Sequence, residues 1–309
     1  MAVSGVVVRN FDKTKDIDEF VKFYNAAHSD HPKHKDLSVE IAQRYIFGAP
    51  NYDGSSHFLA LKDSKIVGSV KGETFAGTTG VIGMIVRPEN RHLGVEDALH
   101  QSVMRHFQQN ELKDARVLVD SSFPKLVEFY NRQGFEAWKV NYAMSSRLSA
   151  AMLASPQLPI DYAVEIAMGD SEKGAIRNVL DKGFSDADGG AGEILHEFDR
   201  MSAQKDFDPT GLLVARNDAG VVGVSVNFIH PAIPTSGYVV WLAVLPGERG
   251  KGLGKALLLA GMRWMKEKGI ETAELNVDLK NPGALKLYKN CGFVVSSETI
   301  IMNKARLGS

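Results

Sequence analysis

The stretch VVWLAVLPGERGKGLGKAL, Val239–Leu257, decides the fold of this chain. It opens with an apolar run typical of a strand, passes through a turn that contains Gly250, Gly252 and Gly254, and continues with helical spacing. Unpaired N–H groups at a helix start favour an anion, and glycines let a diphosphate approach the backbone. The stretch therefore predicts a phosphate cradle, with a purely structural strand-to-helix turn as the alternative.

Two better-known phosphate-binding sequences do not fit this turn. A P-loop requires Ser or Thr beside its lysine, and neither residue stands beside Lys255. A dinucleotide-binding fold requires Gly-x-Gly-x-x-Gly in a βαβ unit near the chain start, with an acidic residue about 20 positions later. The turn must therefore be interpreted together with the rest of the chain.

The stretch has a second copy earlier in the chain. VRPENRHLGVEDAL, Val86–Leu99, aligns with VLPGERGKGLGKAL, Val244–Leu257, at an offset of 158 residues. The same offset aligns FPKLVEFYNRQGF, Phe123–Phe135, with NPGALKLYKNCGF, Asn281–Phe293. Two blocks that keep one register indicate a duplicated domain rather than a chance match.

Length and composition fit this duplication. A chain of 309 residues with 44% hydrophobic and 24% charged residues is typical of a globular protein with two domains. The predicted domains are 1–148 and 161–309, joined by a linker at 149–160 that contains two prolines. Strands come first in each copy and then alternate with helices, which predicts an α/β fold with a mixed sheet flanked by helices.

The second copy shows these elements most clearly. One helix is expected over 255–268, because Leu258, Met262 and Met265 recur on one face and Gly269 is a typical stop. The other expected strands are 162–167, 212–216, 220–229, 237–245 and 271–279, and the other expected helices are 172–183 and 282–289.

Charge and cysteine content exclude several classes of protein. The 36 basic residues against 37 acidic ones give a net charge of −1, without the basic footprint of a nucleic-acid-binding protein. Cys291 alone forms neither an internal disulfide nor a structural zinc site. No apolar run approaches the roughly 20 residues that cross a bilayer, and the amino terminus shows no signal peptide. These features predict a cytoplasmic protein without nucleic-acid or membrane partners.

The glycine turn and the downstream block together resemble a known family. Arg249-x-x-Gly-x-Gly254 followed by Asn281-x-x-Ala-x-x-Leu-Tyr288-x-x-x-Gly-Phe293 resembles the GCN5-related N-acetyltransferase superfamily. Because the register is duplicated, the chain resembles a tandem member with two such domains. The resemblance covers nearly the whole chain outside the linker, and it is more specific in the second copy.

The resemblance implies acetyl-CoA as co-substrate and no metal. The pyrophosphate of acetyl-CoA would lie on the glycine turn. The pantetheine of acetyl-CoA would pair with the preceding strand, whose backbone polarises the thioester carbonyl. The implied acetyl-CoA site comprises Leu242, Ala243, Val244, Arg249, Gly250, Lys251, Gly252, Leu253, Gly254, Lys255 and Asn281. Tyr288 matches the acid that protonates the departing thiolate, with a core aromatic side chain as the alternative.

The chain departs from the family pattern at the general base. Many relatives have a glutamate five residues before the asparagine, and here that position is Asn276, which is a poor proton acceptor. The candidates for the base are Asp278, Glu274, His230 or a water chain. Alternatively, the acceptor arrives already deprotonated.

The first copy departs further. Glu96 aligns with Gly254, and its carboxylate would repel a diphosphate. Phe123 replaces the asparagine, whereas Tyr130 keeps the position of the tyrosine. We therefore expect the first domain to be structural or to shape the acceptor site, with weak or no acetyl-CoA binding.

Other polar clusters have ordinary interpretations. His28, His31 and His34 have metal-like spacing, but no carboxylate framework accompanies them, which favours a solvated loop. Cys291 is expected to be a small buried side chain rather than a nucleophile.

We expect an acetyl-CoA-dependent N-acetyltransferase whose primary amine acceptor attacks the thioester directly in a ternary complex. Asp186, Asp188 and Glu193 could form an acidic mouth that attracts a cationic amine, with a plain polar loop as the alternative. A non-enzymatic acyl-CoA-binding or regulatory protein and an aminoacyl transferase of the same fold are the alternative functions. The sequence leaves the acceptor open, although a small molecule is favoured, and it allows a monomer or a homodimer.

Overall fold

The structure is a computed structural model that describes residues 5–30, 36–48, 52, 54–75, 77–149, 158–185, 191–204, 206–229 and 235–307. The chain divides into two compact units. Unit 1 comprises Met1–Trp138 and Ile300–Ser309, and unit 2 comprises Lys139–Thr299. Within the described ranges, no helix is long and apolar enough to cross a membrane.

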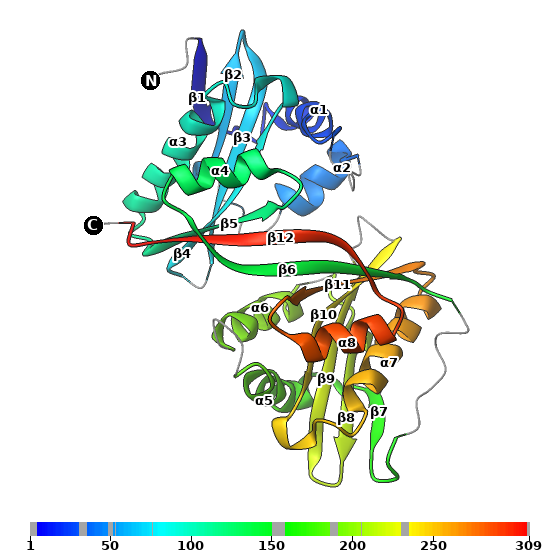
Figure 1. Ribbon diagram of the computed structural model, residues 1–309. Coiled ribbons are helices and arrows are strands. Elements are labelled where there is room, and N and C mark those ends of the chain that lie inside the picture. Colours follow the sequence, from blue (N-terminus) through cyan, green and yellow to red (C-terminus); the bar gives the residue numbers. More distant parts are fainter. Residues whose placement is uncertain are drawn as a thin grey trace. The chain divides into compact units, whose positions relative to one another are not determined.

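Unit 1 is a mixed sheet with helices on both faces (Figure 1). Its strands are β1 (Val6–Asn10), β2 (His57–Lys62), β3 (Lys65–Phe75), β4 (Thr79–Val86), β5 (Asp114–Asp120) and the end of β12 (Val294–Ala305), in that order across the sheet. Its helices are α1 (Ile17–Ala27), the short α2 (Val39–Ile41), α3 (Val95–Gln109) and α4 (Pro124–Arg132). Strands β4 and β5 are parallel, and the pairs β1–β2, β2–β3 and β3–β4 are antiparallel.

Unit 2 repeats this plan. Its sheet has the order β6 (Glu136–Arg147), β11 (Thr272–Asp278), β10 (Ser236–Val244), β9 (Gly220–Ile229), β8 (Leu212–Asn217) and β7 (Ala163–Ile166). Its helices are α5 (Lys173–Gly183), α6 (Gly192–Ser202), α7 (Leu253–Glu267) and α8 (Pro282–Asn290). The prediction of a mixed sheet flanked by helices in two tandem domains is confirmed.

The last strand of the first sequence copy, β6, belongs to the sheet of unit 2. The end of β12, the last strand of the second copy, belongs to the sheet of unit 1. Strand β6 pairs antiparallel with β11, and its Met144 is buried in the core of unit 2. Met302 of β12 is buried in the core of unit 1, and Leu307 donates its N–H to the oxygen of Lys113 at 3.1 Å. The compact units therefore differ from the predicted 1–148 and 161–309 division. Residues 150–157 of the predicted linker lie outside the described residues.

Helix α7 shows why the local pattern was informative. Leu258, Met262 and Met265 are each 0% exposed, as their spacing predicts, and they pack into the core of unit 2. The helix ends at Glu267, and Gly269 follows with a φ of +83°, a conformation that glycine adopts without strain. This helix carries the glycine turn at its amino terminus.

Candidate active site

Strands β10 and β11 separate beside the glycine turn. They pair in parallel only at Ser236–Tyr238 with Thr272–Glu274, although both strands continue further. The next residues of β10 pair on their other side with β9, where Leu242, Ala243 and Val244 lie opposite Ser225, Val224 and Gly223. Leu242, Ala243 and Val244 are thus on a strand whose β11-facing edge can pair with an extended ligand.

A bulge in β10 begins this separation. The register with β9 shifts between Val239 and Trp241, so an extra residue is inserted in β10. Val240 and Trp241 consequently both pack with the α5 and α6 cluster, whereas Val239 and Leu242 pack with the α7 and α8 cluster. Trp241 is half-buried, with its ring 6.3 Å from that of Phe198.

The glycine turn leaves space above its backbone. Gly250 and Gly252 have φ angles of +82° and +85°, and an added Cβ at either position would meet nothing within 4 Å. Gly254 has ordinary helical geometry, and its added Cβ would come only within van der Waals contact of Leu287, at 3.6 Å. The first two glycines are therefore needed for the turn itself, and at none of the three positions would an added Cβ clash with its surroundings.

The amino terminus of α7 is suited to an anion. Gly252 is its N-cap and offers no side chain to the first N–H groups of the helix, which belong to Leu253, Gly254 and Lys255. The first turn contains no acidic residue. Lys255 is exposed, whereas the Leu253 side chain is 1% exposed and lies in the core. Leu253 can thus contribute to the predicted site only through its backbone.

Arg249 and Lys251 already have partners within unit 2. Arg249 donates hydrogen bonds to the backbone oxygens of Gly183, at 2.9 Å, and Val244, at 3.3 Å, which tie the turn to the ends of α5 and β10. Lys251 contacts Glu248 and the Tyr162 hydroxyl, both at 2.8 Å, and the Glu248 carboxylate raises the pKa of Lys251. The structure therefore gives both side chains a role in positioning the turn.

Asn281 and Tyr288 lie at the start and near the end of α8. The Asn281 Oδ1 atom accepts a hydrogen bond from the N–H of Ala284 at 3.0 Å, so the side chain caps the helix. Tyr288 is 8% exposed and packs in the same cluster as Leu242 of β10. Burial raises the pKa of Tyr288 to about 12, so its phenol stays protonated at neutral pH. Cys291 is buried, as expected.

Acidic side chains line the opposite face of β11. Ala273, Leu275 and Val277 are buried against the α7 and α8 cluster, and the alternation of the strand places Glu274 and Asn276 on the other face. Tyr238 of β10 hydrogen bonds to Glu274, and burial together with this carboxylate raises the pKa of Tyr238 to about 12.

Of the two remaining candidates for the general base, Asp278 and His230, the structure describes only Asp278. Asp278 accepts a hydrogen bond from the N–H of Lys280 at 2.8 Å, in the turn before α8. His230 lies outside the described residues, as do Asp186 and Asp188 of the predicted acidic mouth, and Glu193 is in the first turn of α6. Among the described candidates, Glu274 lies beside the point where β10 and β11 separate.

The corresponding turn of unit 1 contains its own anion. Gly94 is the N-cap of α3 with a φ of +85°, as Gly252 is for α7. Glu96 is 5% exposed, and its two carboxylate oxygens accept the N–H of His92 at 3.0 and 3.2 Å. A carboxylate thus occupies the turn that is open in unit 2.

The strand and the helix beside this turn also differ in unit 1. The Phe123 ring lies 5.6 Å from the guanidinium carbon of Arg91, so it bridges the start of α4 and the turn. Strand β4 pairs with β3 from Thr79 to Val86 without a register shift, and Gly83 stands where β10 has Trp241. Tyr130 is 0% exposed, and its buried hydroxyl has no hydrogen-bond partner among the described residues.

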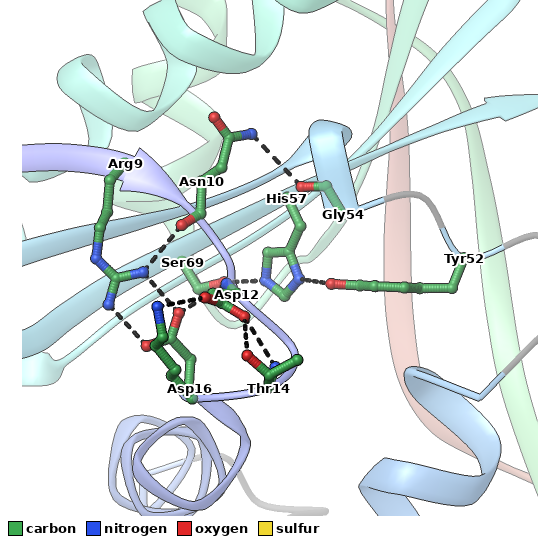
Figure 2. A network of polar contacts seen from close by, with 10 residues as sticks. Arg9, Asn10, Asp12, Thr14, Asp16, Tyr52, Gly54, His57 and Ser69 are labelled. Carbon is green, nitrogen blue, oxygen red and sulfur yellow. Dashed lines mark hydrogen bonds and ion pairs between the residues drawn. The ribbon is translucent and has the colours of Figure 1, made fainter.

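A buried polar network supports the other side of unit 1 (Figure 2). His57 is 2% exposed, and its ring nitrogens contact the Tyr52 hydroxyl at 3.0 Å and the Ser69 hydroxyl at 2.8 Å. Its ring stacks on Phe11 with the centroids 4.6 Å apart. Burial lowers the pKa of His57 to about 3. The network links β2 to β3. None of these residues was among those predicted for the acetyl-CoA site.

Of the three histidines with metal-like spacing, the structure describes only His28. The Nδ1 atom of His28 lies 3.0 Å from the backbone oxygen of Tyr24, whereas His31 and His34 lie outside the described residues. Within the described ranges, no group of three or more His, Cys, Asp or Glu side chains has a metal-binding arrangement.

Comparisons with known proteins identify both halves of the chain. Residues 176–293 match the Acetyltransferase (GNAT) family, and residues 22–145 match the Acetyltransferase (GNAT) domain. A mycothiol acetyltransferase from Frankia casuarinae is 27% identical over 221 residues, which cover 68% of this chain and 64% of that protein. The chain therefore spans just under two thirds of the length of that relative.

Two solved structures share the fold. A GCN5-related N-acetyltransferase from Sphaerobacter thermophilus has a TM-score of 0.81 at 18% identity, covering 99% of this chain and 97% of that one. A tandem GNAT protein from the clavulanic acid biosynthesis pathway has a TM-score of 0.76 at 15% identity, covering 98% and 99%. At these identities the likeness concerns the fold alone.

Proposed function

Because the chain belongs to the GCN5-related N-acetyltransferase family, a family of acyltransferase enzymes, we propose that unit 2 transfers the acetyl group of acetyl-CoA to a primary amine. Acetyltransferases of this family use acetyl-CoA as co-substrate. The observation that carries the proposal is the separation of β10 from β11 beside an open helix amino terminus. Together these features offer an edge for an extended chain and a cradle for a diphosphate.

Acetyl-CoA fits this site in one orientation. The pyrophosphate lies against the backbone of Gly250–Lys255, where the helix dipole and the free N–H groups favour negative charge. The pantetheine extends along Leu242, Ala243 and Val244, and their backbone groups hold the thioester. A backbone N–H aimed at the thioester oxygen stabilises the negative charge that develops during acyl transfer.

The reaction forms a bond between the amine nitrogen and the acetyl carbon and breaks the carbon–sulfur bond. Tyr288 donates its phenolic proton to the departing thiolate, which is why a phenol that remains protonated is useful there. The amine must lose a proton before or during attack. Glu274 accepts this proton, directly or through a water, while Tyr238 holds its carboxylate in place.

The acceptor is a small-molecule amine. The relatives named mycothiol acetyltransferase support a small-molecule acceptor. The acidic side chains on the face of β11 away from the core support a cationic amine. We expect unit 1 not to bind acetyl-CoA, because the carboxylate of Glu96 lies at its turn and the Phe123 ring packs against Arg91 of the same turn.

Calorimetric titration of acetyl-CoA into the whole chain tests the proposal first. One site per chain is expected. Thiol release should follow with at least one amine of a panel that includes glucosamine, spermidine, L-lysine and deacetylated mycothiol. Binding without thiol release for a broad amine panel would favour a non-enzymatic acyl-CoA-binding protein. Absence of acetyl-CoA binding would overturn the proposed function altogether.

A further inference from the structure

Three cross-strand pairs form one surface of unit 2. They are Ser145–Glu274, Ala143–Asn276 and Asn141–Asp278, each consisting of a β6 residue directly opposite a β11 residue. We call these six residues the acceptor floor. Side chains directly opposite in an antiparallel pair have their Cβ atoms only about 5 Å apart, so each pair acts as one local unit.

Strand alternation fixes which face the acceptor floor occupies. Tyr142 and Met144 of β6 pack in the same cluster as Leu275 and Val277 of β11, together with the residues of α7 and α8. The residues between them therefore point to the opposite face of the sheet. An acceptor must approach from this face, because the core fills the other one.

The acceptor floor is rich in hydrogen-bond acceptors. The Oδ1 atom of Asn141 is buried and has no hydrogen-bond partner among the described residues. Glu274 and Asp278 add two carboxylates, while Asn276 is exposed and the small Ala143 opposite it leaves room. An ammonium group has three donors and no acceptor, which matches this set.

We propose that the acceptor floor receives the cationic amine of the acceptor, so that Asn141 and Ser145 are specificity residues of unit 2. This rests on the proposed function, because the site of transfer on β10 places the acceptor next to Glu274. Both residues belong to the first sequence copy, and β6 carries them into the other unit. The first half of the chain thus contributes to recognition by supplying a strand, without binding acetyl-CoA itself.

A thiol placed on the acceptor floor tests this without knowledge of the acceptor. Ala143→Cys is made in a Cys291→Ala background, because Cys291 is the single native cysteine and is buried. The acetyl-CoA-bound protein is labelled with methanethiosulfonate reagents that carry ethylammonium or ethylsulfonate. The cationic reagent should react at least about tenfold faster, and labelling should abolish thiol release with an active amine while acetyl-CoA affinity stays unchanged.

Charge variants assign the effect to particular residues. Adding Asn141→Asp should raise the preference for the cationic reagent several-fold, whereas Ala219→Asp, in the exposed turn between β8 and β9, should leave it unchanged. Replacing Glu274 and Asp278 by their amides should abolish the preference. Equal labelling rates, no labelling of a folded variant, or full activity after labelling would each overturn the inference. Failure to bind acetyl-CoA before any labelling would instead contradict the proposed function.

Discussion

The two carboxylate oxygens of Glu96 share the single backbone N–H of His92, at 3.0 and 3.2 Å. Glu96 occupies the position in α3 that Gly254 occupies in α7. One helix amino terminus thus carries a built-in anion, and the other has an open turn with no acidic residue in its first helical turn. This single difference is the clearest distinction between the two units.

Substitution of Gly254 by glutamate should abolish acetyl-CoA binding to unit 2. The new carboxylate would place a negative charge beside the diphosphate and repel it. We expect affinity to fall by at least about 100-fold in calorimetry. Gly254→Ala is the control, because its Cβ meets only Leu287 at 3.6 Å, and it should retain binding. Equal losses in both variants would show that space rather than charge matters.

Restoring glycine in unit 1 should not create a second acetyl-CoA site. Glu96→Gly removes the carboxylate, but the Phe123 ring still contacts Arg91 and β4 still lacks the bulge of β10. Titration should therefore give one site per chain in both the parent and the variant. A stoichiometry of two in Glu96→Gly would mean that charge alone closes unit 1.

Replacement of Tyr288 by phenylalanine should lower kcat by about 100-fold, the usual range for loss of a general acid. Acetyl-CoA affinity should change little, because the hydroxyl rather than the ring is removed. Since burial raises the pKa of Tyr288 to about 12, the phenol stays protonated at lower pH. The parent kcat should therefore show no loss attributable to tyrosine ionisation near pH 10. Unchanged turnover in Tyr288→Phe would exclude the residue from the mechanism.

Stability should fall as the pH drops below about 6.5. Folded His57 remains neutral down to about pH 3, whereas a histidine in the unfolded chain takes up a proton near pH 6.5. The unfolded state therefore gains protons first, which lowers the free energy of unfolding by about 1.4 kcal/mol per pH unit. Denaturant titrations of the parent and His57→Gln at pH 7.5 and 5.5 measure the contribution of His57 to the free energy of unfolding. A pH dependence equal in both proteins would assign it to other groups.

Truncating a side chain near the carboxyl terminus should destabilise the unit formed mainly by the first half of the chain. Met302 is 0% exposed in the core of unit 1, so Met302→Ala should cost about 2–5 kcal/mol there. Hydrogen exchange should accelerate in β3 and β4 more than in β9 and β10. Met144→Ala, its counterpart in unit 2, should show the reverse pattern. Acceleration of β9 and β10 in Met302→Ala would contradict the exchange of closing strands.

Local patterns were sufficient to predict most elements of the second sequence copy. The run 220–229 is strand β9 as predicted, and α7 and α8 begin and end within about two residues of the expected positions. The glycine turn also lies where its sequence places it, between β10 and α7. These features depend on neighbours along the chain, such as helix periodicity and the φ angles that glycine permits.

The sequence by itself determined the duplication, the α/β class and the glycine turn between a strand and a helix, because each of these is visible in local residue patterns. Only the tertiary structure decided that β6 closes the sheet of unit 2 and that the end of β12 closes the sheet of unit 1, because strand pairing joins segments far apart in the chain and no local pattern selects the sheet edge. It also decided that Arg249, Lys251 and Asn281 stabilise the turn and the helix start, and that Asn141 lies opposite Asp278. Such contacts join residues far apart in the chain, where packing rather than local spacing selects the partner.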